Sequence, residues 1–342
     1  MNKFAYGVDF GWVSQLESMG IHWVDEAGTL IDPYVAAKRL GADSVRLRVF
    51  VDPPKSAYWQ KRDGTVCMLG FCDPMSVLVA AKRVKQNGMR LMLDVHYSDH
   101  FADPEYQEIP SDWLMDNDVM LEQRVRLHTL KLLWMLKSEG ITPEWIQIGN
   151  EINPGILLPY GSLSEHPKDL VRFLNAGFEA VKEVDPAIQV MIHLSRLYDS
   201  KETEPFLDNF FENGGKTDIL AFSYYPYWAE LETREKTGEP YTHSKESVKE
   251  RINRIYNTYQ KPVMIAEIGG YESEPEETRG FIQDTIEVLK ELPGDNGRGI
   301  FYWEPEVNSS ILPDGYPLGA AELVSENTLR FTDALSVYSE QV

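Results

Sequence analysis

The chain has 342 residues, and its 33 Lys and Arg against 54 Asp and Glu give a net charge of −21 with histidine neutral. This acidic balance argues against a nucleic-acid partner or an anionic membrane surface, because both would repel the protein. Hydrophobic residues make up 43% of the chain, a value typical of globular proteins. No apolar run reaches the roughly 20 residues of a membrane span, and no linker-like segment divides the chain. We therefore expect one domain over residues 1–342, and a monomer.

Short apolar runs alternate with longer amphipathic segments. The runs cover residues 5–10, 44–50, 90–96, 145–150, 188–193, 218–223, 262–267 and 299–303. Apolar residues recur at helical spacing in residues 33–40, 74–87, 119–138, 169–184, 204–212, 245–259, 277–292 and 328–338. Eight strand–helix units predict an α/β fold, a (β/α)8 TIM barrel. An open doubly wound sheet is the alternative, which the missing glycine-rich turn after the first strand disfavours.

Polar residues stand at or near the carboxyl ends of several predicted strands. A strand buried on both faces should be apolar, so a charged residue there is either paired or functional. In a barrel these strand ends form the catalytic face. The residues that we expect to form or support the site are Asp9, Arg48, Asp94, His96, Asn150, Glu151, Tyr225, Trp228, Glu267 and Trp303.

Glu151 and Glu267 are the strongest catalytic candidates. Each follows or ends a predicted strand, the fourth and the seventh of the barrel, and both side chains would reach one cleft. Two carboxyl groups in one cleft hydrolyse glycosidic bonds when one acts as acid/base and the other as nucleophile. A single glutamate at a strand end is more often a solvated loop residue, but two of them, one preceded by Asn150, favour a catalytic pair.

The remaining candidates have supporting roles in this hypothesis. A guanidinium from Arg48 beside Glu267 would lower the pKa of that carboxyl group and keep it ionised. His96 would hydrogen-bond a sugar hydroxyl or Arg48, Tyr225 would donate to the nucleophile, and Trp303 would stack under a sugar ring. The structural alternatives are an ion pair for Arg48, a satisfied core position for His96 and core packing for Trp303.

Other kinds of site find little support. His96, Asp99 and His100 lie close together in the sequence, but no further ligand follows at a suitable spacing, so we expect no metal and no cofactor. The sequence contains neither a G-x-S-x-G elbow nor a phosphate-binding loop of the G-x-x-x-x-G-K-[ST] type. Cys67 and Cys72 are expected to be free thiols, with a small disulfide loop as the alternative in an oxidising compartment.

Five ordered segments carry a resemblance to a known family. The chain resembles glycoside hydrolase family 53, the arabinogalactan endo-β-1,4-galactanases of clan A, from about Gly7 to Pro305. The segments read VRLRVFVDP at 45–53, LDVHYSD at 93–99, QIGNEIN at 147–153, SYYPYW at 223–228 and FYWEP at 301–305. Together they are specific, whereas an Asn-Glu pair alone is not.

The resemblance implies retaining hydrolysis of β-1,4-galactan in a (β/α)8 barrel. It assigns the acid/base to Glu151 and the nucleophile to Glu267, with carboxyl groups about 5–5.5 Å apart. Asn150 would hydrogen-bond the 2-hydroxyl of the sugar that is attacked. Because the implied partner is a polysaccharide of pectic side chains, we expect an extracellular, cell-surface or periplasmic location, although the sequence alone leaves a cytoplasmic enzyme open.

The chain departs from the family pattern at two aromatic positions. Leu158 stands where the family has an aromatic residue, and Phe101 stands where tryptophan is common, so the number of sugar-binding subsites is open. The short segment 269–275 lacks the Asp/Asn-rich calcium loop of some bacterial members, and we expect no calcium there. The alternatives are a related clan A hydrolase of another β-1,4-glycan and a galactan-binding protein without turnover.

Overall fold

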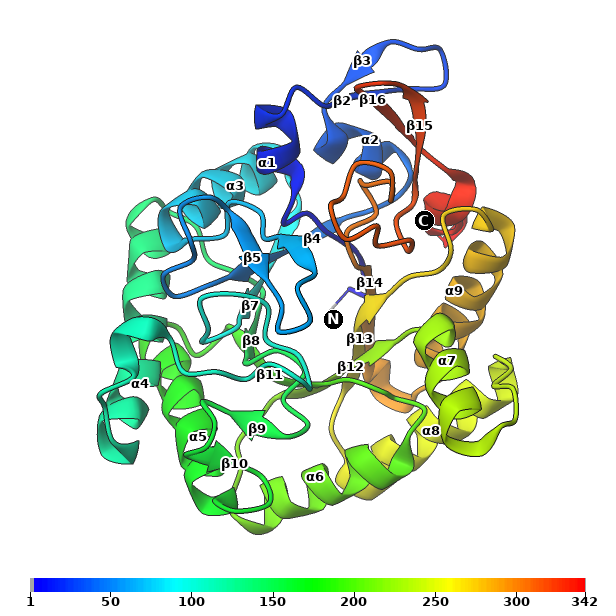
Figure 1. The fold of residues 1–342 in the computed structure, drawn as a ribbon. Coiled ribbons are helices and arrows are strands. Elements are labelled where there is room, and N and C mark those ends of the chain that lie inside the picture. Colours follow the sequence, from blue (N-terminus) through cyan, green and yellow to red (C-terminus); the bar gives the residue numbers. More distant parts are fainter. Residues whose placement is uncertain (1–2, 342) are drawn as a thin grey trace.

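The computed structural model describes residues 3–341, and its centre is a closed barrel of eight parallel strands (Figure 1). Each strand pairs with its neighbours in chain order, and the last strand pairs with the first. The predicted (β/α)8 fold is therefore confirmed, and the open sheet is excluded. The barrel strands are β1 (Ala5–Asp9), β4 (Ser44–Val49), β7 (Arg90–Val95), β8 (Trp145–Ile148), β11 (Gln189–Leu194), β12 (Ile219–Tyr224), β13 (Val263–Ile268) and β14 (Gly297–Tyr302).

Helices form a ring around the barrel, as Figure 1 shows. They are α2 (Pro33–Arg39), α3 (Pro74–Gln86), α4 (Asp118–Ser138), α5 (Pro167–Val184), α6 (Ser200–Glu212), α8 (Lys245–Tyr259) and α9 (Pro275–Lys290). Two of them begin at an Asp-Pro pair. The side chain of Asp32 accepts hydrogen bonds from the free N–H groups of Tyr34 and Val35, and Pro33 has no N–H to satisfy. Asp73 caps α3 in the same way.

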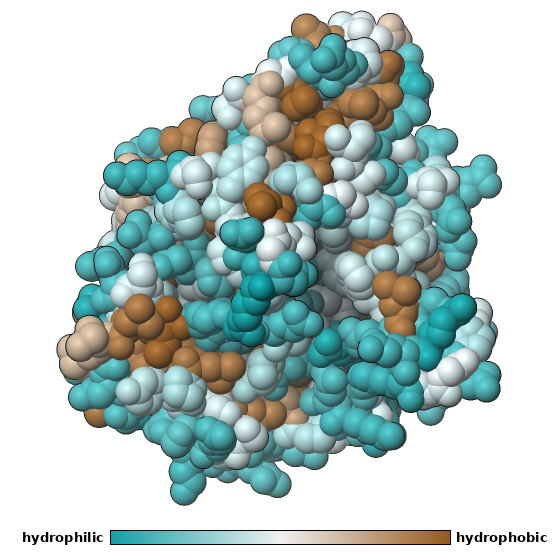
Figure 2. Space-filling view, in the orientation of Figure 1, coloured by the Kyte–Doolittle hydropathy of each residue, from teal (hydrophilic) through white to brown (hydrophobic). Residues whose placement is uncertain are grey.

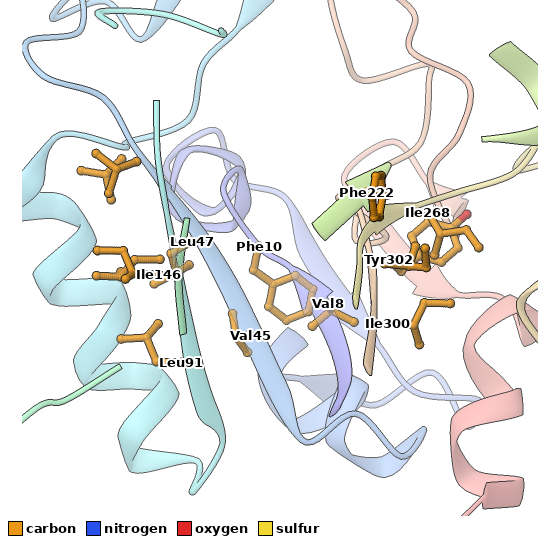
Figure 3. Close-up of a cluster of buried hydrophobic side chains, with 14 of the residues drawn as sticks. Val8, Phe10, Val45, Leu47, Leu91, Ile146, Phe222, Ile268, Ile300 and Tyr302 are labelled. Atoms are coloured by element: carbon orange, nitrogen blue, oxygen red, sulfur yellow. The ribbon is translucent and has the colours of Figure 1, made fainter. Parts of the chain in front are cut away.

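The hydrophobic core has two parts. The larger part lies between the barrel and the helices, where Val8, Val45, Leu47, Leu91 and Ile300 point outward from their strands (Figure 3). The smaller part fills one end of the barrel interior with Ala5, Met92, Trp145, Met191, Ile219, Ala221, Met264, Ala266 and Phe301. Toward the carboxyl ends of the strands the barrel interior becomes polar. One end of the barrel is therefore a packed apolar core, and the other end holds the residues that can carry chemistry.

The C-terminal segment differs from the prediction. Residues 328–338 were expected to form a helix, but Thr328–Phe331 is a strand, β16, and a 3-10 helix follows at Asp333–Gln341. β16 pairs with β15 (Ala321–Ser325) and β2 (His22–Val24), and β3 (Leu30–Ile31) completes this small sheet. Leu329 packs into the core from the strand, and Leu335 and Tyr338 pack into it from the 3-10 helix. The buried residues of this segment therefore come from two elements and not from one helical face.

Several shorter elements were not predicted. They are α1 (Val13–Ser18), α7 (Pro226–Thr237), the hairpin β5 (Tyr58–Gln60) with β6 (Val66–Met68), the hairpin β9 (Gly155–Ile156) with β10 (Gly161–Ser162), and the short 3-10 helices Ser111–Trp113 and Pro293–Asp295. Cys67 and Cys72 are buried free thiols, as the first interpretation had it. Within residues 3–341, no helix is both long and apolar enough to cross a membrane.

Candidate active site

The carboxyl ends of the barrel strands surround a cavity that opens on the face in Figure 2, where hydrophilic residues border the central hollow. Glu151 and Glu267 both line this cavity, so the strands bring the two predicted catalytic residues together. The other predicted residues that line it are His96, Asn150, Tyr225, Trp228 and Trp303. Asp9, Arg48 and Asp94 are instead buried among other residues, each with 1% exposure or less.

Glu151 follows β8 in a tight and strained turn. Gly149 has φ +88°, and Glu151 itself has φ +45°, a conformation that costs energy for a residue with a side chain. A Cβ atom at position 149 would also lie 2.5 Å from Cγ2 of Ile152. The turn places Oε1 of Glu151 2.6 Å from Oγ of Ser223 on β12.

Glu267 lies within β13 and is held by two donors. Nη2 of Arg46 donates to Oε1 at 2.8 Å, and the hydroxyl of Tyr225 donates to Oε2 at 3.0 Å. The predicted contact of Tyr225 with the nucleophile candidate is therefore present. Both oxygens of Glu267 have a fixed donor, which orients the carboxyl group in the cavity.

The prediction that Arg48 lies beside Glu267 is wrong, because Arg46 occupies that position. Arg48 pairs with Glu304, donates to the carbonyl oxygen of Leu69 at 3.1 and 3.0 Å, and stacks over the ring of Phe101 at 4.9 Å. Residues two apart on a strand face the same side, so both arginines point inward but at different depths. The ion-pair alternative for Arg48 describes its contacts.

Asp9 and Asp94 act on the site through Arg46. Arg46 forms ion pairs with Asp9 and, at 2.8 Å, with Asp94. It also donates to Gln147 at 2.6 Å and to Oδ1 of Asn150 at 2.9 Å. This buried guanidinium is compensated on every side, which a charge in the barrel interior requires. Burial alone would raise the pKa of Asp94, but Arg46 and a neighbouring histidine lower it to about 2.

The two catalytic candidates differ in their tendency to ionise. Burial, and secondarily the nearby Glu267, raises the pKa of Glu151 well above its usual range. Burial raises the pKa of Glu267 as well, so the expected lowering is wrong in its net direction, but Arg46 and the hydroxyl of Tyr225 oppose that rise. Two interacting carboxyl groups lose their protons in two steps. The cation beside Glu267 directs the first ionisation to it and leaves Glu151 protonated.

His96 uses both ring nitrogens inside the protein. Nε2 lies 2.8 Å from Oδ2 of Asp94, and Nδ1 accepts a hydrogen bond from the backbone N–H of Ala102 at 2.9 Å. Burial lowers the pKa of His96, and Asp94 opposes that change. The predicted hydrogen bond from His96 to a sugar hydroxyl or to Arg48 is therefore wrong, although the ring lines the cavity.

Aromatic rings form one wall of the cavity. Trp303 packs against Trp12 and Tyr316 with ring centroids 5.2 and 4.8 Å apart, and Phe101 packs against Trp303 at 6.3 Å. These rings present apolar surface to the cavity, which suits the C–H face of a sugar. Trp228, on α7, is 38% exposed at the rim.

Comparison with known proteins decides the family. The profile of glycosyl hydrolase family 53 matches residues 5–338. The chain belongs to this family.

Relatives within family 53 cover most of the chain. An arabinogalactan endo-beta-1,4-galactanase from Cellvibrio japonicus is 30% identical over 88% of this chain and 80% of its own length. An uncharacterized protein in the bgaB 5′ region of Niallia circulans is 30% identical over 88% and 83%, respectively. The solved GH53 catalytic domain from Ignisphaera aggregans superposes with a TM-score of 0.80 at 27% identity, covering 99% of this chain and 96% of that one.

The sequence analysis assigned no role to three residues of this family 53 site. Arg46 holds Glu267, Ser223 contacts Glu151, and His193 contacts Ser223 at 2.9 Å. All three are polar residues inside otherwise apolar strands, and that pattern is the signal that could have found them. Within residues 3–341, no cluster of three or more His, Cys, Asp or Glu side chains has the arrangement of a metal site.

Proposed function

We propose that this family 53 hydrolase is an endo-β-1,4-galactanase that cleaves with retention, Glu151 acting as acid/base and Glu267 as nucleophile. The observation that carries the proposal is the unequal environment of two glutamates in one cavity. Glu267 is held by Arg46 and Tyr225, which favour its charged form, whereas Glu151 is buried beside that charge. One ionised and one neutral carboxyl group are what double displacement needs at its start.

In the first step, Glu267 attacks the anomeric carbon while Glu151 gives its proton to the departing glycosidic oxygen. The bond to the leaving sugar breaks as a covalent ester to Glu267 forms. In the second step, Glu151 takes a proton from water, whose oxygen displaces Glu267 from the anomeric carbon. The sugar is released with its original configuration, and Glu151 regains its proton.

The surrounding residues suit a sugar in this position. Asn150 lines the same cavity as the two glutamates, where it would hydrogen-bond the 2-hydroxyl of the sugar that is attacked. Trp303 and Trp228 offer apolar faces for neighbouring sugar rings. The relative from Cellvibrio japonicus is named for galactan cleavage, which supports β-1,4-galactan as the substrate. Since a polysaccharide does not cross a membrane unaided, we also propose action outside the cytoplasm.

Substrate and roles are tested by separate experiments. Release of reducing sugar from galactan, mannan, glucan and xylan identifies the polymer, and we expect galactan to be cleaved at least about 100-fold faster than the others. Preferential cleavage of another polymer would overturn the substrate. Galactan binding without release of reducing sugar would favour the non-catalytic alternative.

The variants Glu151→Gln and Glu267→Gln test the roles. Both should lose about 10³-fold or more in kcat on galactan. An aryl β-galactoside whose leaving group needs no proton should restore the first step in Glu151→Gln but not in Glu267→Gln. Turnover like that of the unaltered enzyme in either variant would reject the assigned role.

A further inference from the structure

The contacts of Glu151 extend inward to two residues with no assigned role. Building on the proposed role of Glu151 as acid/base, we propose that Ser223 and His193 form a hydrogen-bond relay that holds Glu151 in its protonated form until the substrate takes the proton. Ser223 and His193 are positioning residues in this proposal, because they act on the substrate only through Glu151.

The relay is a continuous row of short contacts across three neighbouring strands. Oε1 of Glu151 lies 2.6 Å from Oγ of Ser223, and that Oγ lies 2.9 Å from Nε2 of His193. Nδ1 of His193 lies 2.8 Å from Oδ1 of Asn150. Ser223 is 2% exposed and His193 is fully buried, so these interior contacts have no competition from bulk water.

The inner end of the relay has a fixed direction. Oδ1 of Asn150 accepts from Nη2 of Arg46 at 2.9 Å, and Nδ2 of Asn150 donates to the carbonyl oxygen of Ala102 at 2.7 Å. If the amide were flipped, its NH2 group would face the donor of Arg46, and its oxygen would face the carbonyl oxygen of Ala102. Because Oδ1 only accepts, Nδ1 of His193 must carry a hydrogen and donate to it.

The state of His193 then fixes the hydroxyl of Ser223. The pKa of His193 lies well below its usual range because the ring is buried and because Arg46 is nearby, and the nearby His96 acts in the same direction while Asp94 opposes it. A neutral ring with hydrogen on Nδ1 has a lone pair on Nε2. Ser223 must therefore donate its only hydrogen to Nε2.

Ser223 consequently has only lone pairs to offer to Glu151. If Ser223 donated to Oε1, the hydrogen bond would lower the pKa of Glu151. With its hydrogen directed to Nε2 of His193, Ser223 can only accept, so the 2.6 Å contact is a hydrogen bond when Glu151 carries the proton on Oε1 and donates it to Oγ. The other groups that act on Glu151 are Glu267 and Asp103, which also favour the neutral acid, and Arg196, which opposes it. The direction of the hydrogen bonds in the relay therefore favours the protonated form of Glu151, in addition to the effect of these more distant charges.

Loss of the proton from Glu151 forces the relay to break or to reverse. To donate to a carboxylate, the Ser223 hydroxyl must leave Nε2 of His193, and two lone pairs then face each other unless the buried ring gains a proton. Either outcome is unfavourable. When Glu151 takes a proton from water in the second step, the original direction returns, so the relay favours the reset of the acid.

The most direct test is the ¹⁵N NMR spectrum of histidine-labelled free protein. We expect His193 to be neutral with hydrogen on Nδ1, the opposite tautomer from His96, whose Nδ1 accepts from a backbone N–H. His193→Phe assigns the signal by its absence, and His193→Gln serves if the first variant does not fold. In Glu151→Gln an amide N–H replaces the acid O–H, so the signal of His193 should not move. A hydrogen on Nε2, or a large shift in Glu151→Gln, would overturn the proposal.

The pH profile of kcat/KM on galactan gives an independent readout, since its alkaline limb reports the pKa of the acid. In His193→Phe the Ser223 hydroxyl is free to donate to the carboxylate, and the limb should move to lower pH by about one unit. Ser223→Ala should move it by less, and Ser223→Thr should restore it. Thr129→Val, which removes a buried hydroxyl from α4, is the control and should leave it unchanged. Unshifted limbs in both relay variants would contradict the proposal.

The two readouts separate this proposal from the proposed function. An inactive unaltered protein would overturn the galactanase assignment, and the tautomer of His193 would still decide the relay. An active enzyme with the wrong tautomer would overturn the relay alone.

Discussion

Nη2 of Arg46 on β4 donates a 2.8 Å hydrogen bond to Oε1 of Glu267 on β13, three strand positions away around the closed barrel. The same guanidinium pairs with Asp9 and Asp94, so the proposed nucleophile is fixed to a cation that is itself fixed to two more strands. An open sheet could not form this connection, because its outer strands do not meet.

Arg46→Lys should impair chemistry, because the single ammonium group of lysine cannot bind the five oxygen partners that surround the guanidinium. We expect kcat/KM to fall by about 100-fold or more. Since Glu267 must be ionised to attack, loss of the guanidinium raises its pKa and moves the acidic limb of the pH profile to higher pH.

Arg48→Lys is the matched control for this substitution. It loses contacts to Glu304 and Leu69, so we expect a lower melting temperature with little movement of the acidic limb. If Arg48→Lys moved that limb and Arg46→Lys did not, the assignment of the guanidinium to Glu267 would be wrong.

Tyr225→Phe removes the hydroxyl that donates to Oε2 of Glu267 at 3.0 Å. A hydrogen bond to a charged group contributes about 1.5–3 kcal/mol, so we expect kcat to fall by roughly 10- to 100-fold. The ring is kept, and the melting temperature should change little. Steady-state kinetics together with thermal unfolding checks this prediction, which full activity in the variant would refute.

Trp303→Ala should weaken sugar binding, because it removes the largest ring that faces the cavity from β14's carboxyl end. We expect KM for galactan oligosaccharides to rise about tenfold or more, since stacking of this kind contributes about 1 kcal/mol beyond the lost contact area. Trp134→Ala, at a 51% exposed position on α4, is the control. Equal KM values for both variants would argue against a sugar platform at Trp303.

Acid should destabilise the fold partly through His128. Its Nε2 is shielded from water without a hydrogen-bond partner, and burial lowers its pKa to about 4. The unfolded chain binds this proton below about pH 6.5 and the folded chain does not, so stability falls as the pH drops from 6.5 toward 4.

His128→Phe should reduce this pH dependence. The change in unfolding free energy caused by the substitution should be more favourable at pH 5 than at pH 8 by up to about 2 kcal/mol. This value is an upper limit, because the ring is partly exposed. Urea unfolding at the two pH values measures the difference. An equal effect of the substitution at both pH values would contradict the lowered pKa.

The sequence indicated the barrel because buried parallel strands are continuous apolar runs, and all eight began and ended within about two residues of the observed strands. It was wrong at residues 328–338, where the apolar spacing suits a helix but pairing with β2 imposes a strand. It also missed α7, because the aromatic segment 223–228 drew attention as a motif rather than as a helix start. Pairing with β2 and β15 decided the structure of residues 328–331, and local spacing does not encode such pairing.

For the site, the sequence placed both glutamates and Tyr225 in one cavity but chose the wrong arginine. Arg46 and Arg48 lie two residues apart on one strand and both point into the barrel, so they differ only in their depth along it. The predicted contact of His96 with a sugar hydroxyl or Arg48 needs a free ring nitrogen, but Asp94 and the backbone N–H of Ala102 occupy both nitrogens. His193 and Ser223 were absent from the prediction, because their partners come from other strands and become visible only in three dimensions.

The central claim is that Glu267 becomes bonded to the sugar during turnover. Its most direct test is mass spectrometry of the protein after reaction with an activated 2-deoxy-2-fluoro-β-galactoside, which slows both steps and accumulates the intermediate. We predict one added glycosyl group, located on Glu267 in the digested protein and absent from Glu267→Gln. A group on another carboxylate, or inactivation without any covalent adduct, would contradict the account.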